Sequence, residues 1–384
     1  MHNRNDMLKV VFDHQVFSLQ KFGGVSRCFV ELHKHMPDSC HTTIAVHESD
    51  NIYVRELDGV KPSGYQYDHF ITASHFWGKS RLHHWMDHLK RHPYYPDYNQ
   101  NYSIELLKAG QFDVFHPTYF DDYFLPYLNG KPFVLTIHDM IPELYPQYFK
   151  RDDPQIVLRK KLAPLASAIV AVSENTKQDV VKILGVSEEK IHVVYHGCSF
   201  PTTGSPSLYA FPYILFVGER GKYKQFSLFV RSVIPVLKKH QDIHVICTGC
   251  PFSQQEQESF RDYGVSDRFH HHWVETDHDL YSLYHHAQCF VYPSEYEGFG
   301  IPILEAYQAE CPVILNHASC FPEIAGDSAL YFTSEEELTA QIEQSLVMSS
   351  DERHTLLRQQ IQRLSMYSWE KSARQLAAIY QSLC

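Results

Sequence analysis

The sequence predicts an α/β protein made of two doubly wound, Rossmann-like domains that face each other across a cleft. Its 384 residues exceed what one hydrophobic core usually holds, about 250–300 residues. Short apolar runs alternate with amphipathic segments, as in parallel strands covered by helices on both faces of a sheet. A stretch rich in Gly, Pro, Ser and Thr at residues 197–207 interrupts this alternation, which then starts again. We therefore expect one domain at residues 1–200 and another at residues 201–367.

The first domain is predicted from its apolar runs. A strand over Leu8–Phe12 leads through the pair Gly23 and Gly24 into a helix over Val25–His35. Further strands are expected at Val114–His116, Phe133–Ile137, Ala168–Val172 and Ile191–Tyr195. Runs that are apolar on both faces and separated by helical segments indicate buried parallel strands.

The second domain repeats this pattern and ends in a helical third. Strands are expected at Tyr213–Val217, Ile243–Thr248, Cys289–Tyr292 and Val313–Leu315, and helices at Phe226–Lys239, Asp279–Ala287, Gly300–Ala309, Glu335–Val347, Asp351–Leu364 and Trp369–Ser382. Doubly wound sheets bind ligands outside the carboxyl ends of their strands. The cleft between the two domains is therefore where we expect a ligand.

Composition narrows the class of partner and the compartment. The apolar content of 44% and charged content of 21% are typical of a globular protein and exclude a disordered chain. The net charge of −11, most of which falls after residue 200, argues against nucleic acid as the main partner, because phosphate backbones need a basic surface. No apolar run has the length of a secretory signal or of a membrane span. We expect a cytoplasmic protein.

The nine cysteines fit a reducing compartment, because scattered cysteines in a long chain without a signal are usually free. Cys247 and Cys250 form a C-x-x-C pair, but a zinc site of this type needs a second pair nearby. We interpret Cys247 as the end of a buried strand and Cys250 as part of the following loop.

The most informative stretch is Pro293–Ala306, which follows a predicted strand and opens a predicted helix. Gly298 and Gly300 let the backbone approach a ligand closely, and the free N–H groups of the helix start favour an anion. Glu297 in the loop and Glu305 in the helix offer carboxylates that accept hydrogen bonds from hydroxyls. This combination suits a ligand that carries both hydroxyls and a phosphate.

In this context, Glu297 and Glu305 resemble the E-x7-E signature of the retaining GT-B glycosyltransferases of glycosyltransferase family 4. The resemblance extends over nearly the whole chain, and in the family the first glycine turn faces the donor phosphates across the cleft. The donor-binding residues that it implies are Gly23, Gly24, Gly298, Phe299, Gly300 and Glu305. Residues 367–373 are also similar to a family pattern, which implies that residues 368–384 form a helix that packs back on the N-terminal domain.

The resemblance implies four catalytic residues, namely Glu297, His138, Arg220 and Lys224. Residues 217–224 resemble the strand-end motif whose Arg and Lys clamp the donor diphosphate. This sequence departs from the common form, with Glu219 after the glycine and a shortened spacing, so Lys222 is an alternative to Lys224. His138 ends a predicted strand, and in the family a histidine at this place touches the donor sugar.

The implied activity is transfer of a sugar from a UDP-, GDP- or ADP-linked donor to an acceptor hydroxyl, with retention of the anomeric configuration. Arg220, Lys224 and the helix-start amides would stabilise the leaving diphosphate. Glu297 would hold the donor sugar and steady its positive anomeric centre, and Glu305 would hold the ribose hydroxyls. The resemblance implies no cofactor and no essential metal, and the sequence has no Asp-x-Asp motif at Asp121-Asp122 or Asp152-Asp153.

The acceptor is expected on the N-terminal domain, as a saccharide or a lipid-linked glycan. The candidate acceptor-side residues are Asp139, His116, Trp85 and Arg81. The last two belong to a basic, aromatic segment at residues 75–102, in which Leu82, Trp85, Met86 and Leu89 predict a helix with one apolar stripe. Two interpretations of this segment stay open: peripheral contact with an anionic membrane or lipid-linked acceptor, or ordinary packing on the domain.

Residues 12–15, Phe-Asp-His-Gln, are similar to bacterial enzymes that build capsule or lipopolysaccharide, among which GDP-mannose is a common donor. A peripheral place at the inner face of the membrane would suit that role. The alternatives are a GT-B nucleotide-sugar epimerase, a phosphorylase, for which no cofactor lysine site is apparent, and a non-catalytic sugar-nucleotide-binding scaffold. A scaffold has no need of Glu297, Glu305, Lys224 and His138 together.

Overall fold

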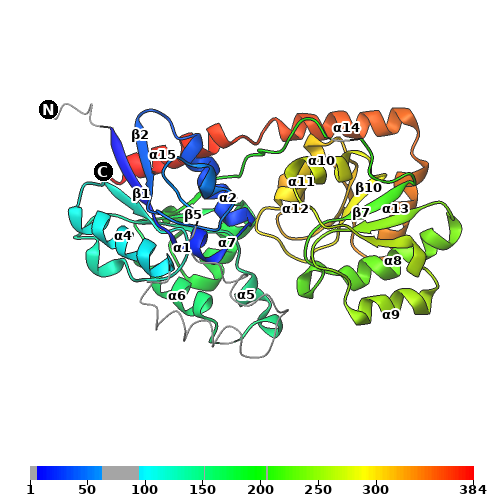
Figure 1. Cartoon of the computed structure of the whole chain (residues 1–384), viewed down its shortest axis with the longest axis horizontal. Coiled ribbons are helices and arrows are strands. Elements are labelled where there is room, and N and C mark those ends of the chain that lie inside the picture. Colours follow the sequence, from blue (N-terminus) through cyan, green and yellow to red (C-terminus); the bar gives the residue numbers. More distant parts are fainter. Residues whose placement is uncertain (1–6, 63–94, 151, 205) are drawn as a thin grey trace.

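The computed structural model describes residues 7–62, 95–150, 152–204 and 206–384. Figure 1 shows two domains side by side, with the C-terminal end of the chain lying against the N-terminal domain. The helix expected around Leu82–Leu89, together with Trp85 and Arg81, lies outside the described residues. Among the described residues, no helix is both long and apolar enough to cross a membrane.

The N-terminal domain contains parallel strands in two groups, with the orders β2-β1-β3 and β4-β5-β6. A parallel bridge between Phe115 and Phe133 joins the groups, and the Phe115 amide donates to the Pro132 carbonyl at 3.1 Å. The described strands therefore form one parallel sheet. Their bounds are β1 Leu8–Phe12, β2 Cys40–Ile44, β3 Val114–His116, β4 Val134–Ile137, β5 Ala168–Ala171 and β6 Ile191–Val193.

The C-terminal domain contains a parallel sheet with the order β12-β11-β10-β7-β8-β9. Its bounds are β7 Tyr213–Phe216, β8 His244–Cys247, β9 Phe269–His271, β10 Cys289–Tyr292, β11 Val313–Asn316 and β12 Leu330–Phe332. This is the strand order of a Rossmann sheet, in which the direction of winding reverses between the first strand, β7, and the fourth, β10. The loops after β7 and β10 therefore meet at the topological switch point.

Helices cover the sheets of both domains (Figure 1). Those of the N-terminal domain are α1 Gln15–Leu19, α2 Gly24–Lys34, α4 Tyr95–Ala109, α5 Ile141–Leu144, α6 Pro154–Leu162 and α7 Glu174–Leu184. Those after residue 200 are α8 Phe226–Lys239, α9 Gln254–Tyr263, α10 Asp277–His285, α11 Ile301–Gln308, α12 Phe321–Ala325, α13 Glu335–Val347, α14 Ser350–Leu364 and α15 Trp369–Ser382. Side-chain caps start several of them, such as Ser173 of α7, whose hydroxyl accepts from the Thr176 amide.

The last helix, α15, packs on the N-terminal domain. Its buried residues Trp369, Leu376 and Tyr380 belong to the same apolar cluster as Val10 and Phe12 of β1. Figure 1 shows α14 running along the C-terminal domain and α15 returning beside β1 and β2. The chain thus crosses between the domains twice, and this restricts how far the two domains can separate.

The predicted class, two Rossmann-like α/β domains, is confirmed. Three short strands were not expected from the sequence: β2, β9 and β12. All three lie at the edges of their sheets and carry partly exposed residues. β2 and β9 contain His or Thr and so lack the uniformly apolar run of a central strand, whereas β12, Leu-Tyr-Phe, is apolar but only three residues long. Cys247 ends β8 in the core and Cys250 is exposed in the next loop, as predicted, and both are free thiols.

Candidate active site

Lys224 and Glu297 meet at the switch point of the C-terminal sheet. Lys224 ends the short 3-10 turn η6, Lys222–Lys224, which follows β7, and Glu297 lies in the loop after β10. The Lys224 Nζ donates to Glu297 Oε1 at 2.6 Å, and the two side chains are 20% and 12% exposed. An ion pair that is only partly covered can exchange its partner for a charged ligand, which a fully buried pair cannot do without a large desolvation cost.

The loop that carries Glu297 is held by hydrogen bonds on its backbone. The Glu297 amide donates to Ser319 Oγ at 3.1 Å, and the same hydroxyl donates to the Glu297 carbonyl at 2.6 Å. Gly300 has a φ of 86°, a left-handed conformation that other residues rarely adopt, and α11 begins directly after it. The loop is thereby fixed while the Glu297 side chain stays available.

The N-terminal domain touches this loop at Gly298. A Cβ atom built at Gly298 would lie 1.6 Å from the carbonyl oxygen of His138, so only glycine fits there. The Gly298 carbonyl accepts from Ser173 Oγ at 2.6 Å and from Thr176 Oγ1 at 3.3 Å. The end of β4 and the start of α7 are therefore placed directly against the Glu297 loop, and the site is shared by both domains.

His138 is neutral in this environment. Burial, with a smaller effect of the Arg159 charge, lowers its pKa to about 4. Its ring stacks on that of His196 at 5.8 Å between centroids, and its buried Nε2 has no hydrogen-bond partner within the described residues. Buried ring nitrogens normally have partners, so an unpaired Nε2 beside the Glu297 loop is suited to a ligand hydroxyl.

Asp139 lies next to the same loop. Burial raises the pKa of its carboxyl, Arg159 opposes this rise, and the nearby Glu297 carboxylate adds to it. Its Oδ1 accepts from the Ile141 amide at 3.0 Å, at the start of α5. The structure therefore places Asp139 beside the candidate site, with one carboxylate oxygen occupied by its own backbone.

Glu305 forms the second carboxylate of the site and is almost fully buried. Burial raises its pKa to about 7, against the opposing effect of Arg27 and with a further rise from Asp277. Tyr284 donates to Glu305 Oε2 at 3.4 Å, and Arg27 Nη1 lies 3.7 Å from Oε1. Arg27 comes from α2 of the N-terminal domain, and the sequence did not single it out.

The glycine pair of the N-terminal domain faces the start of α11. A Cβ atom at Gly24 would lie 3.7 Å from the Cδ1 atom of Ile301, the first residue of α11. Gly24 is itself the first residue of α2, so the two helix starts lie against each other across the cleft. Their free N–H groups give a positive potential on both sides of this point, which favours a phosphate.

Arg220 is not brought to Glu297. Its guanidinium donates to Glu256 Oε1 at 2.8 Å, to the Thr248 carbonyl at 2.8 Å and to the Pro251 carbonyl at 2.9 Å. It also lines a hollow between α8 and α9 together with Phe226. Its role as a diphosphate clamp stays a prediction, and its contacts are those of a side chain that ties the β7 and β8 loops to α9.

Lys222, the alternative to Lys224, extends toward the other domain. It is exposed, and its Nζ lies 4.6 Å from the ring centroid of Phe149 in the N-terminal domain. Of the two lysines, Lys224 is therefore the one that contacts Glu297.

The side chains of two predicted site residues are buried in contacts inside the protein. His116 was expected on the acceptor side, but it is fully buried, with Nδ1 2.6 Å from the Tyr380 hydroxyl and Nε2 2.8 Å from Thr136 Oγ1. That interpretation is wrong, because both ring nitrogens are occupied inside the protein. The ring of Phe299 packs on His196 at 4.9 Å and on Tyr367, so this side chain supports the domain interface, and its role in donor binding stays a prediction.

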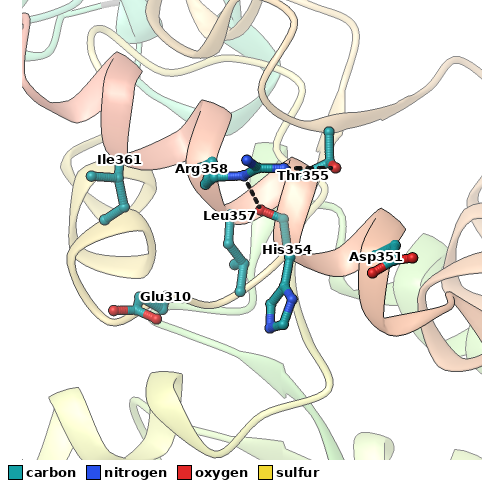
Figure 2. Close-up of a pocket in the computed structure, with 7 residues that line it drawn as sticks. All are labelled: Glu310, Asp351, His354, Thr355, Leu357, Arg358 and Ile361. Carbon is teal, nitrogen blue, oxygen red and sulfur yellow. Dashed lines mark hydrogen bonds between the residues drawn. The ribbon is translucent and has the colours of Figure 1, made fainter.

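A separate hollow lies along α14, as Figure 2 shows. It is lined by Glu310, Asp351, His354, Thr355, Leu357, Arg358 and Ile361. Arg358 donates to the His354 carbonyl and to Thr355 Oγ1 of the same helix, each at 3.4 Å. No predicted site residue lines it, so it is distinct from the candidate active site. Within the described part of the chain, no group of three His, Cys, Asp or Glu side chains is placed to hold a metal ion.

The fold and the site together define the GT-B class of glycosyltransferases, two Rossmann-like domains with a carboxylate and a lysine at the switch point of the C-terminal one. Residues 22–199 match the family model described as Glycosyltransferase Family 4, and residues 209–362 match the model described as Glycosyl transferases group 1. The chain belongs to the glycosyltransferases of family 4 type.

Named relatives agree with this membership. The chain is 27% identical over 213 residues to the O-antigen chain mannosyltransferase RfbU of Salmonella typhimurium, covering 56% of this chain and 59% of that protein. It is 25% identical to the O-antigen chain mannosyltransferase B of Escherichia coli, over 68% of this chain and 73% of the relative. The match to the serotype-specific mannosyltransferase WbdA of Escherichia coli, 23% identical, covers 62% of this chain but only 32% of that protein.

Solved structures share the whole fold. HepE of Anabaena in complex with UDP and glucose superposes with a TM-score of 0.71 at 16% identity, covering 98% of this chain and 100% of the other. A glycosyltransferase of Rickettsia africae superposes with a TM-score of 0.67, also at 16% identity, over 98% and 99% of the two chains. At this identity the likeness shows the fold, and it confirms the predicted GT-B arrangement.

Proposed function

We propose that this protein transfers a sugar from a nucleotide-diphosphate sugar to an acceptor hydroxyl of a saccharide or lipid-linked glycan, with retention of configuration, in the synthesis of a bacterial surface polysaccharide. The observation that carries the proposal is the Lys224–Glu297 pair at the switch point, where the His138 end of β4 and the starts of α2 and α11 also meet. Cation, carboxylate, neutral imidazole and amide donors in one place match the parts of such a donor.

The donor diphosphate gains negative charge as it leaves, and this charge must be stabilised. Lys224 can exchange part of its contact with Glu297 for a phosphate oxygen, because the two side chains keep 20% and 12% of their surface exposed. The starts of α2 and α11 add N–H groups whose dipoles point at the same place. Preorganised donors of this kind commonly supply a large share of catalysis in transfer reactions.

Glu297 would accept a hydrogen bond from a donor sugar hydroxyl and stabilise the positive charge that develops on the anomeric carbon. The bond from that carbon to the phosphate oxygen breaks, and a bond to the acceptor oxygen forms on the same face. The departing phosphate oxygen takes the acceptor proton, so no separate general base is needed and the configuration is retained. The unpaired Nε2 of His138 would hold a further sugar hydroxyl.

Glu305 would accept from the ribose hydroxyls of the nucleotide. It is buried behind the glycine loop and touches Tyr284 and Arg27, so a ribose would complete its hydrogen bonding. No organic cofactor is part of this proposal, because the donor itself carries the activated bond. Lys224 and the helix starts take the place that a metal ion has in other diphosphate sites.

GDP-mannose is the first donor to test, since all three relatives named above are mannosyltransferases. UDP- and ADP-linked sugars are the alternatives. Capsule or O-antigen chains at the inner face of the membrane would be the corresponding acceptors, reached by a cytoplasmic enzyme that binds the membrane peripherally.

The proposal is tested by incubating the purified chain with a panel of UDP-, GDP- and ADP-sugars and mannose-terminated acceptors. We expect release of one nucleoside diphosphate that depends on acceptor, and a product whose anomeric proton in NMR shows the configuration of the donor. A changed sugar with intact nucleotide would instead indicate an epimerase. Tight nucleotide-sugar binding without turnover on any acceptor would indicate a scaffold, and an inverted product would overturn retention.

A further inference from the structure

Arg27 reaches out of its own domain into the nucleotide side of the cleft. It lies in α2, three residues after Gly24, and its side chain is 10% exposed. Its Nη2 lies 3.0 Å from Asp277 Oδ2 at the start of α10, and its Nη1 lies 3.7 Å from Glu305 Oε1 in α11. The guanidinium also donates to the Ser199 carbonyl in the linker between the domains. One buried cation thus joins both domains and the linker.

The surroundings of Glu305 explain why a cation is needed there. The charged and titratable groups that face it are Arg27 from α2, Tyr53 before the 3-10 turn Val54–Glu56, Asp277 and Tyr284 from α10, and Cys198 from the linker. Burial and Asp277 both disfavour the Glu305 carboxylate, whereas Arg27 favours it. Burial also lowers the pKa of Arg27 itself, but Asp277 and Glu305 outweigh this, so the guanidinium stays charged. Arg27 is the cation that keeps two neighbouring carboxylates together.

The geometry also links this contact to the phosphate side of the cleft. Gly24 packs on Ile301 at the start of α11, while Arg27, on the same turn of α2, contacts Glu305 one turn further along α11. Any movement of α2 relative to α11 would therefore change the amide cradle and the Glu305 contact together. A side chain that only held the two domains together would not need to contact Glu305, the carboxylate predicted to bind the ribose.

We propose that Arg27 is a positioning residue for the nucleotide ribose, holding the Glu305 carboxylate ready to accept the ribose hydroxyls. The ribose pocket is then complete only when the N-terminal domain is seated on the C-terminal one. This inference rests on the proposed function, because it assumes that Glu305 binds the ribose of a nucleotide donor.

The test measures binding of GDP, UDP and inorganic pyrophosphate by calorimetry to the full chain and to its Arg27→Met, Arg27→Lys and Glu305→Gln variants. We expect Arg27→Met to weaken the nucleoside diphosphate that the parent binds by about tenfold, and to leave pyrophosphate, which has no ribose, nearly unchanged. Arg231→Met is the matched control, because Arg231 pairs with Glu335 at 2.7 Å on the exposed side of α8. Thermal unfolding of each variant checks that the fold is kept.

The pH dependence of nucleotide affinity distinguishes a role of Arg27 in positioning Glu305 from a role only in holding the two domains together. Burial holds the pKa of Glu305 near 7, so nucleotide affinity should rise as the pH increases through 7 and the carboxylate becomes charged. Without the Arg27 charge the carboxylate is harder to ionise, so the rise moves to higher pH in Arg27→Met and returns toward the parental position in Arg27→Lys. Glu305→Gln should bind weakly at every pH, and adding Arg27→Met to it should have little further effect.

Different results overturn different statements. If the parent binds neither GDP nor UDP, the proposed function fails and this inference fails with it. If the parent binds a nucleotide but Arg27→Met binds it equally well, with the same pH profile, only the role of Arg27 is wrong. Equal loss of pyrophosphate and nucleotide binding would assign Arg27 to the phosphates instead. A full loss on adding Arg27→Met to Glu305→Gln would show that it does not act through Glu305.

Discussion

The two domains have the same kind of sheet but use their switch points differently. In the C-terminal sheet the winding reverses between β7 and β10, and Lys224 and Glu297 occupy the loops there. In the N-terminal sheet β1 lies between β2 and β3, so the winding reverses between β1 and β3. Asp13 is the first residue after β1 and lies at this switch point. Both positions carry a carboxylate, yet their surroundings differ.

Asp13 is fully buried and its oxygens are saturated. It accepts from the amide and side chain of Gln15 at 3.3 and 2.8 Å, from the amide and hydroxyl of Thr118 at 2.8 and 2.7 Å, and from the Tyr123 hydroxyl at 3.1 Å. Glu297 is also mostly buried, but among the described residues its carboxylate contacts only two side chains, Lys224 and Tyr292. The topological position brings a carboxylate to the sheet edge in both domains, and the number of protein donors around it decides whether it can still bind a ligand.

The largest effect on turnover should come from removing either member of the Lys224–Glu297 pair. Glu297→Ala and Lys224→Ala should each lower turnover by about 100- to 10,000-fold, because each removes charge stabilisation that is needed mainly in the transition state. Steady-state release of the nucleoside diphosphate measures this loss. Thermal unfolding should change by only a few degrees, since neither side chain belongs to the apolar clusters of the two domains.

A second Lys–Glu pair of this protein provides the control. Lys239 of α8 pairs with Glu343 of α13 at 2.5 Å, away from the switch point, and the lysine is 66% exposed. Lys239→Ala and Glu343→Ala should leave turnover as in the parent. Parental turnover in Glu297→Ala and Lys224→Ala as well would mean that the site has been assigned to the wrong residues.

Disrupting the N-terminal switch point should affect stability instead. Asp13→Ala leaves the donors of Gln15, Thr118 and Tyr123 without their acceptor inside the protein, which costs about 3 kcal/mol or more of unfolding free energy. Urea unfolding of the variant measures this cost. The fraction that remains folded should turn over donor at close to the parental rate, and a loss of turnover without a loss of stability would contradict the structural role of Asp13.

Arg220 and Lys224 allow the same comparison, between a charged group occupied by protein partners and one that can bind a ligand, within a single loop. It stands four residues before Lys224, but its guanidinium is held by Glu256 and by the carbonyls of residues 248 and 251. Arg220→Met should therefore lower the thermal midpoint and reduce turnover by about tenfold at most, well below the loss in Lys224→Ala. If turnover falls as far as in Lys224→Ala while the fold is unchanged, Arg220 clamps the diphosphate in the bound state, as the family resemblance implies.

The sequence predicted the central strands well because they are buried on both faces. β7 was expected at Tyr213–Val217 and runs over Tyr213–Phe216, and β10 was expected and found at Cys289–Tyr292. The edge strand β2, with the sequence Cys-His-Thr-Thr-Ile, carries exposed and half-buried side chains, so no apolar run marks it. An edge strand is defined by its neighbour, which lies elsewhere in the chain.

The site was predictable where a motif lies within one loop and not where distant segments meet. Glu297, Gly298 and Gly300 share one strand–loop–helix turn, so their sequence describes their geometry. His116 ends a strand as expected, but Tyr380, from the far end of the chain, occupies its Nδ1. One feature of the sequence pointed to Arg27. It lies three positions before Val30 in α2 and so shares the buried face of that helix, where a charged side chain requires a partner from another element. Its partners, Asp277 and Glu305, could be identified only in the structure.

The smallest effect is expected from metal removal. EDTA should leave turnover within about twofold of the parental rate, because Lys224 and the starts of α2 and α11 supply the positive charge that the diphosphate needs. The measurement is nucleoside diphosphate release before and after chelation, repeated with added Mg²⁺. Loss of turnover in EDTA with recovery in Mg²⁺ would show that a cation shares this role. Rescue of Lys224→Ala by Mg²⁺, with the parent insensitive to it, would instead show that a metal ion can take the place of the lysine ammonium. Asp13 could not accept such an ion, because its oxygens already accept hydrogen bonds from Gln15, Thr118 and Tyr123.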